Sequence, residues 1–307
     1  MPRRLVVAAA AGSALVLATA TGAGASGSPF AQASYTSASA FKGHAPTIDV
    51  NVTTDGGFSL PRQVRAGFVT FRVSTPEDTY HGWQGFRLEN GATVDQVIHD
   101  FTIGVAGETL EENAEGAQGL LRDATLVGGV VTTPVAPIEV TLPLERGTYY
   151  FFDLADIFNG VTPRVHALRA VGTPNWKGLP RYSQVIQTVM DGMDPRFIAP
   201  TDQHADGTYL VVNSPSDEIH EAVWRAVIPG TTDAYITQYY NAFLAGTPIA
   251  RPWLDSQHGL QAMSPNRFAV IHIDLPPGQY ALLCLVPSDE SGLPHAYIGM
   301  HEVVTLQ

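Results

Sequence analysis

The sequence contains a single cysteine among 307 residues, Cys284. One cysteine cannot form an internal disulfide, and a free exposed thiol outside the cell would be oxidised. Cys284 is therefore expected either to be buried and inert or to be held by a metal ion.

Basic residues are also scarce. The chain has 17 Lys and Arg against 29 Asp and Glu, and its net charge is −12. Loss of Arg3 and Arg4 with an N-terminal signal would leave 15 basic and 29 acidic residues, a charge near −14. This charge argues against nucleic acid and against anionic membrane surfaces as partners. It permits a basic protein partner without naming one.

Long apolar runs are confined to the N-terminus. An Ala-rich run from Leu5 to about Ala20 follows a short basic start and is too short to span a membrane comfortably. No later segment approaches the ~18 continuous apolar residues of a membrane-spanning helix. The small residues Ala23-Gly24-Ala25 form a plausible cleavage site. Residues 1–25 are predicted to be a signal peptide cleaved after Ala25, and the mature protein to be secreted or extracytoplasmic, without membrane insertion.

The mature chain is long enough for two domains. Residues 26–45 are rich in Ser, Ala and Gly and are predicted to be a flexible lead-in. Two units are expected at 46–172 and 195–307, and a linker at 173–194 joins them. Within this linker, Ser183 to Met193 could form a short helix.

The two units look like diverged copies of one repeat. In each, an apolar stretch and a polar turn end at a histidine, His81 in the first copy and His220 in the second. Ten residues after each histidine, a glycine precedes an amphipathic stretch that is predicted to be helical, 93–101 or 231–243.

The ends of the copies match as well. Gly147–Asp153 parallels Gly278–Cys284, and each predicts a β-strand after a glycine turn. Further on, His166–Val171 parallels His295–Met300. The first copy keeps both histidines, but Asp replaces Cys and Val replaces Met. We therefore infer one unit able to bind a metal and one relic that serves as scaffold.

Each copy is predicted to contain about seven short strands with Pro and Gly turns and one helical insertion, a pattern typical of a Greek-key β-sandwich. The expected fold is therefore all-β, with two tandem sandwiches and short helical insertions.

The second copy carries a set of soft donors. Cys284, His295 and Met300 fall within seventeen residues, and His220 is a good candidate for a second imidazole. A thiolate, imidazoles and a thioether together suit copper that changes oxidation state. Alone, each residue has a more ordinary explanation: Met as core filler, His as a turn residue, Cys as an inert thiol. Their order, and the joint loss of both sulfurs in the first copy, favour a metal site.

The first copy leaves another metal site open. His81, Asp153 and His166 could hold a hard or borderline metal, since zinc accepts histidine and aspartate.

These motifs resemble those of the cupredoxin family, the type 1 (blue) copper proteins. Gly278-x-Tyr280-x-x-x-Cys284 is similar to the penultimate strand of that family. The loop from Cys284 to Met300 is similar to its three-ligand loop, with ten residues between Cys and His and four between His and Met. That spacing is closer to copper nitrite reductases than to plastocyanin. The resemblance covers 195–307 well and 46–172 weakly.

The resemblance implies a cupredoxin-like fold and one type 1 copper ion with four ligands: His220, Cys284, His295 and Met300. It also implies that His295 is the more exposed ligand and the electron exit. Asn213, Glu218 and Glu221 are candidates to brace the ligand imidazoles.

Catalysis is not favoured by the sequence. Multicopper oxidases and copper nitrite reductases share this fold, and their second copper centre uses a histidine immediately before the cysteine. Here that residue is Leu283, and the chain has no His-x-His pair. A nucleophile elbow and a phosphate loop are also absent.

The expected function is therefore single-electron transfer with an unidentified redox protein. Copper carriage to an acceptor would use the same ligands and stays an alternative. A metal-free interaction module on the same scaffold is a third hypothesis, because a fold alone does not fix a function.

Overall fold

The computed structural model describes four stretches of the chain: residues 45–54, 57–134, 136–192 and 194–307. The predicted signal peptide and all but the last residue of the predicted lead-in lie outside these described residues. Within the described stretches, no helix is both long and apolar enough to cross a membrane.

Strands dominate both halves of the chain. The first half contributes β1 (Thr47–Asn51), β2 (Gln63–Ser74), β3 (His81–Leu88), β4 (Ala124–Thr132), β5 (Ile138–Leu144), β6 (Gly147–Asp153) and β7 (His166–Asn175). The second half contributes β8 (Gln184–Asp191), β9 (Asp194–Ile198), β10 (Asp202–Gln203), β11 (Asp206–Asn213), β12 (His220–Val227), β13 (Trp253–Met263), β14 (Arg267–Asp274), β15 (Gly278–Leu283) and β16 (His301–Leu306). The helices are α1 (Val94–Ala106), α2 (Leu110–Asp123), α3 (Leu154–Phe158), α4 (Asp233–Leu244) and the 3-10 helix η1 (His295–Ile298).

The strand order arranges the sheet in two layers. One layer has the strand order β10-β16-β15-β12-β13-β4-β3-β6-β7. The other has the order β2-β5-β14-β11-β8-β9, and β1 pairs with β2. The layers are linked where β7 pairs with the start of β2. Apolar side chains from both layers form one core. In that core Phe71 of β2 contacts Trp83 of β3, whose ring stacks on Phe151 of β6.

Each half of the chain forms one sandwich, which confirms the predicted pair of β-sandwiches. Both layers continue from the first sandwich to the second, because β4 pairs with β13 and β5 pairs with β14. The two sandwiches therefore share their sheets and their core. The exact boundaries at 46–172 and 195–307 stay a prediction.

The expected helix in the linker is wrong. Residues 184–191 form β8, which pairs in parallel with β11 and antiparallel with β9. Ile186 and Thr188 are buried on alternate positions, as in a half-buried strand. The open edge of β11 provides the pairing partner, and such tertiary pairing outweighs weak local helix propensity.

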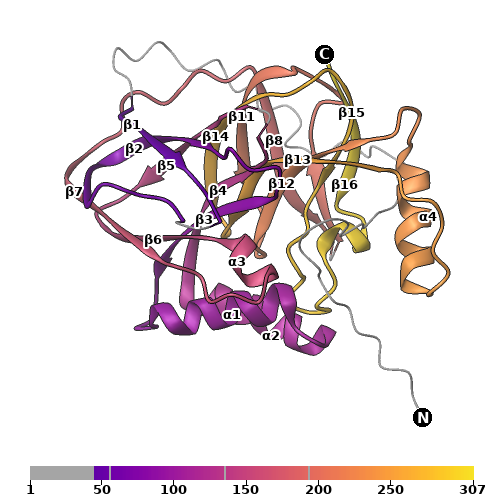
Figure 1. Cartoon of the computed structure of the whole chain (residues 1–307), viewed down its shortest axis with the longest axis horizontal. Coiled ribbons are helices and arrows are strands. Elements are labelled where there is room, and N and C mark those ends of the chain that lie inside the picture. Colours follow the sequence, from indigo (N-terminus) through magenta and orange to yellow (C-terminus); the bar gives the residue numbers. More distant parts are fainter. Residues whose placement is uncertain (1–44, 55–56, 135, 193) are drawn as a thin grey trace.

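The helices confirm the repeat. The predicted stretches 93–101 and 231–243 lie in or beside α1 and α4, each of which begins after a capping threonine. Both helices pack on the outer face of the same layer: Phe101 on Phe152 in the first half and Tyr239 on Trp253 in the second. Figure 1 shows the pair α1 and α2 below the strands and α4 at the right edge. The additional helix α2 was not predicted.

Candidate metal centre

Three of the four predicted ligands meet at one end of the second sandwich. His220 begins β12, Cys284 directly follows β15, and His295 begins η1. β12 and β15 are antiparallel neighbours, with Val223 opposite Leu283, so the start of β12 lies beside the end of β15. The loop after β15 then folds back, so that His295 at the start of η1 lies beside His220 and Cys284.

The donor atoms of these side chains are close together. Nδ1 of His220 lies 3.1 Å from Nδ1 of His295. Sγ of Cys284 lies 3.8 Å from the first of these nitrogens and 3.4 Å from the second. All three side chains are buried, and their donor atoms lie within 4.8 Å of one another. Over the described stretches, no other group of three or more His, Cys, Asp or Glu residues has such spacing.

These separations fit one small metal ion. An ion bound ~2.0 Å from nitrogen and ~2.3 Å from sulfur, as zinc is, holds such donors about 3.2–3.7 Å apart. Of the three donor–donor distances, 3.4 Å lies inside this range, and 3.1 and 3.8 Å lie just outside its two ends. Both imidazoles present Nδ1, so each ring can use its Nε2 for an outer contact.

Met300 closes the same loop. Its N–H donates to the carbonyl of His295 at 2.9 Å, and its carbonyl accepts from the N–H of Cys284 at 3.3 Å. The residue is fully buried. The backbone thus fixes Met300 next to two ligands, and the His-Cys-His-Met cluster is typical of a type 1 copper site.

This cluster is enclosed by β15, the loop after it and the start of the neighbouring β12, within a two-layered β-sandwich. This is the arrangement expected of a cupredoxin fold. The chain is a cupredoxin-fold protein. The fold and the donor set carry this assignment, and the resemblance found in the sequence is confirmed.

Comparisons with known proteins find only distant similarities. No protein-family model matches the sequence, and no curated protein matches it. Among solved structures, the chain is similar to the multicopper oxidase McoA from Aquifex aeolicus, with 10% identity, a TM-score of 0.24, and coverage of 86% of this chain and 66% of that one. It thus spans slightly less than two thirds of the oxidase.

Two other solved structures are similar at the same level. The copper nitrite reductase from Nitrosomonas europaea has 10% identity, a TM-score of 0.23, and coverage of 87% of this chain and 85% of that one. An auracyanin from Roseiflexus castenholzii has 20% identity, a TM-score of 0.25, and coverage of 41% of this chain and 98% of that one. TM-scores this low add nothing to the assignment.

One expectation drawn from the cupredoxins is wrong. His295 was expected to be the more exposed ligand, but it is 0% exposed. Its Nε2 lies 2.9 Å from Oε2 of Glu218, a contact at ion-pair distance. Ser288 in turn donates to the other oxygen of Glu218 at 3.3 Å. The physical reason is that the loop carrying His295 is covered from outside, so this imidazole has no path to solvent.

Of the other two residues predicted to brace the ligands, Glu221 contacts a ligand side chain and Asn213 does not. The N–H of Glu221 donates to Sγ of Cys284 at 3.4 Å, and the carboxylate of Glu221 accepts from the N–H of Leu285 at 2.8 Å. Asn213 forms no hydrogen bond with a ligand side chain. Its amide donates to the carbonyls of Glu218 and Met263 and so holds the turn before β12.

The sequence analysis missed Ser216. Its hydroxyl lies 2.9 Å from Nε2 of His220 and occupies the outer side of that ring. The only signal was its position in the polar turn four residues before the histidine.

Burial sets the protonation of the ligands. It raises the pKa of the Cys284 thiol well above its usual value, and the nearby Glu221 carboxyl adds to this effect. Burial also lowers the pKa of His220 to about 3, with a further contribution from His295. The imidazole is therefore neutral and able to bind a metal. The thiol must lose its proton to do so, and a bound cation stabilises the resulting thiolate.

The first sandwich keeps part of this arrangement and has neither sulfur. Asp153 ends β6 opposite Trp83, two residues after His81, and its carboxylate pairs with Nδ1 of His81. Glu77 contacts Nε2 of the same ring at 3.3 Å. His166 instead packs on the Phe58 ring. The alternative site of His81, Asp153 and His166 is therefore not formed, since these three are not brought together as a ligand group.

Proposed function

We propose that this cupredoxin-fold protein is an exported electron-transfer protein. It binds one type 1 copper ion and transfers single electrons to a redox protein. One observation supports it above all: two imidazole nitrogens and one sulfur, all buried, lie within 4.8 Å of one another. Donors of this kind suit both oxidation states of copper.

The rigidity of the site favours electron transfer. His220 belongs to β12, and Cys284 adjoins β15, which pairs with β12 through four residues of each strand. Hydrogen bonds from outside the cluster hold two of these side chains. The Ser216 hydroxyl bonds to the His220 ring, and the N–H of Glu221 donates to the sulfur of Cys284. Ligands held in this way move little when the charge of a bound ion changes, so an electron can pass with little reorganisation.

Burial of the ligands favours this function over copper carriage. His220, Cys284 and His295 are each at most 1% exposed. Handing the ion to an acceptor would require the loop to open, whereas an electron can leave with the ligands in place.

Export remains part of the proposal. It is supported by the N-terminal sequence alone, since residues 1–25 lie outside the described part of the chain. Catalysis is not part of the proposal, because Leu283 occupies the position where a second copper centre would need a histidine.

The test uses residues 26–307 loaded with one equivalent of Cu(II). We expect an intense blue thiolate-to-copper absorption band, narrow copper hyperfine splitting and fast electron self-exchange. Cys284→Ser should abolish the band. A colourless wild-type protein would refute the proposal, and a blue protein with slow self-exchange and ready copper release would favour carriage.

A further inference from the structure

Neither ligand imidazole reaches the surface. Beyond the Glu218 contact, the loop that carries His295 is covered by α2 of the first sandwich. The side-chain amide of Asn113 donates to the carbonyl of Gly292 at 3.4 Å, and that of Gln118 donates to the carbonyl of Asp289. An electron therefore has to leave by another route than the imidazole edge of His295.

A continuous set of aromatic rings starts two residues after this ligand. Tyr297 lies in η1, and its ring stacks on Tyr240 of α4 with centroids 4.2 Å apart and planes 28° apart. Phe243, one turn further along α4, contacts Tyr297 edge-on at 6.2 Å between centroids. Phe243 is 38% exposed. The rings thus connect the metal-binding loop with the outer side of the molecule.

The inner end of this set adjoins the ligands. Tyr240 belongs to the same apolar cluster as Leu283 and Ala296. Each of these two residues is the chain neighbour of a ligand, Cys284 or His295. Figure 1 shows α4 at the periphery of the molecule, and Phe243 of this helix is exposed to solvent.

We propose that electrons enter and leave the metal centre through Tyr297, Tyr240 and Phe243. This inference rests on the proposed function. In each transfer, one electron passes from the reduced centre to a one-electron oxidant, which is reduced by one electron. No proton moves and no bond is formed or broken. The rings serve as a tunnelling path, so the aromatic system matters and the tyrosine hydroxyls do not.

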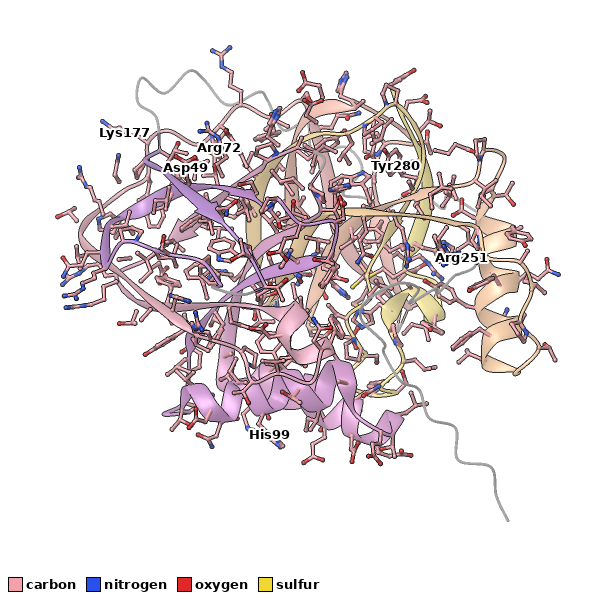
Figure 2. All side chains as sticks on the ribbon, in the orientation of Figure 1. Asp49, Arg72, His99, Lys177, Arg251 and Tyr280 are labelled. Atoms are coloured by element: carbon pink, nitrogen blue, oxygen red, sulfur yellow. The ribbon has the colours of Figure 1, made fainter. Side chains whose placement is uncertain are left out.

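The experiment uses the copper-loaded, reduced chain and the cationic oxidant tris(phenanthroline)cobalt(III), followed by stopped-flow absorbance. Tyr297→Leu removes the ring next to the loop, and Tyr297→Phe keeps it. Trp176→Leu is the matched control, because Trp176, directly after β7, is an aromatic residue that is 45% exposed. Its neighbour Lys177 lies across the molecule from Arg251 and α4 in Figure 2.

We expect Tyr297→Leu to slow oxidation several-fold at unchanged blue absorption and reduction potential. Tyr297→Phe should restore the wild-type rate, and Trp176→Leu should not change it. A wild-type rate in Tyr297→Leu, with its spectrum and potential intact, would overturn the inference.

Two further measurements keep the test decisive. If Tyr297→Leu does not fold, Phe243→Ala at the exposed end should slow the reaction, and an unchanged rate there would overturn the inference. Failure of the proposed function is seen separately, since the wild-type protein would then lack the blue band before any kinetics are measured.

Discussion

At the residue scale, His81 shows what occupies the centre of a cupredoxin sandwich that has lost its sulfurs. The ring is buried between Asp153 and Glu77. Burial lowers the pKa of His81, but the hydrogen bond and charge of Asp153, followed by those of Glu77, outweigh it and raise the pKa overall. An imidazole held between two carboxylates, which favour its protonated form, thus stands where the second sandwich has its ligand cluster.

This pair makes stability depend on pH. Because the pKa of His81 is raised on folding, its contribution is fully present below the unfolded value of about 6.5 and is lost as the pH rises through the folded pKa. We predict that the free energy of unfolding of the wild type contains a component from His81 that falls as the pH rises above about 6.5. His81→Gln should lack this component.

Urea unfolding of both proteins across this pH range measures the difference. Identical pH dependence in wild type and His81→Gln would show that the histidine is not charged in the folded state.

At the scale of elements, the contact of α2 with the metal-binding loop depends on Gly292. Its φ is +68°, and a Cβ there would lie 1.9 Å from the carbonyl oxygen of Leu110 in α2. Gly230 is a natural control, because it has a φ of +87° but nothing within 4 Å of an added Cβ. Both positions have a positive φ, and only at Gly292 would an added Cβ clash with a neighbouring backbone.

We predict that Gly230→Ala destabilises the protein by about 1–2 kcal/mol through left-handed strain alone. Gly292→Ala should cost about 2–5 kcal/mol, because overpacking against α2 is added to the strain. Denaturant unfolding of both variants measures this, and equal losses would show that α2 does not press on the loop.

The sequence predicted the clustering of the candidate ligands better than the elements that cover them. Cys284, His295 and Met300 are close along the chain, so their order and spacing alone reveal a common loop. The contact between α2 and the metal-binding loop instead joins Asn113 to Gly292, which are 179 positions apart in the sequence. No local pattern encodes such a contact. The exposure of His295 was therefore predicted wrongly.

Elements that occur in both copies of the internal repeat were also predictable. The capped, amphipathic stretches of α1 and α4 follow equivalent histidines, and the structure confirms both helices. β8 was missed although Val185, Ile186, Thr188 and Val189 are β-branched residues that favour a strand. The segment completes this strand by pairing with β11.

At the scale of the whole molecule, the two sandwiches depend on each other. The layers pass through the β4–β13 and β5–β14 pairings, and one core includes side chains from both halves. The internal repeat indicated two units, but no sequence pattern indicated that their sheets would join. An isolated unit would expose unpaired strand edges and part of this core.

We therefore predict that residues 182–307 alone, which retain β8 and all four ligand positions, do not unfold cooperatively. Circular dichroism on heating, compared with residues 26–307, checks this. A sharp transition at the same temperature in both would contradict the shared core.

The most direct test of the metal centre is X-ray absorption at the copper edge, on residues 26–307 with one equivalent of copper. We predict two imidazole nitrogens and one short sulfur contact around the ion, because the sulfur of Met300 would be a weak, long ligand. Cys284→Ser should lose the short sulfur contact. Coordination of the wild-type ion by nitrogen and oxygen alone would contradict the binding of copper between His220, Cys284 and His295.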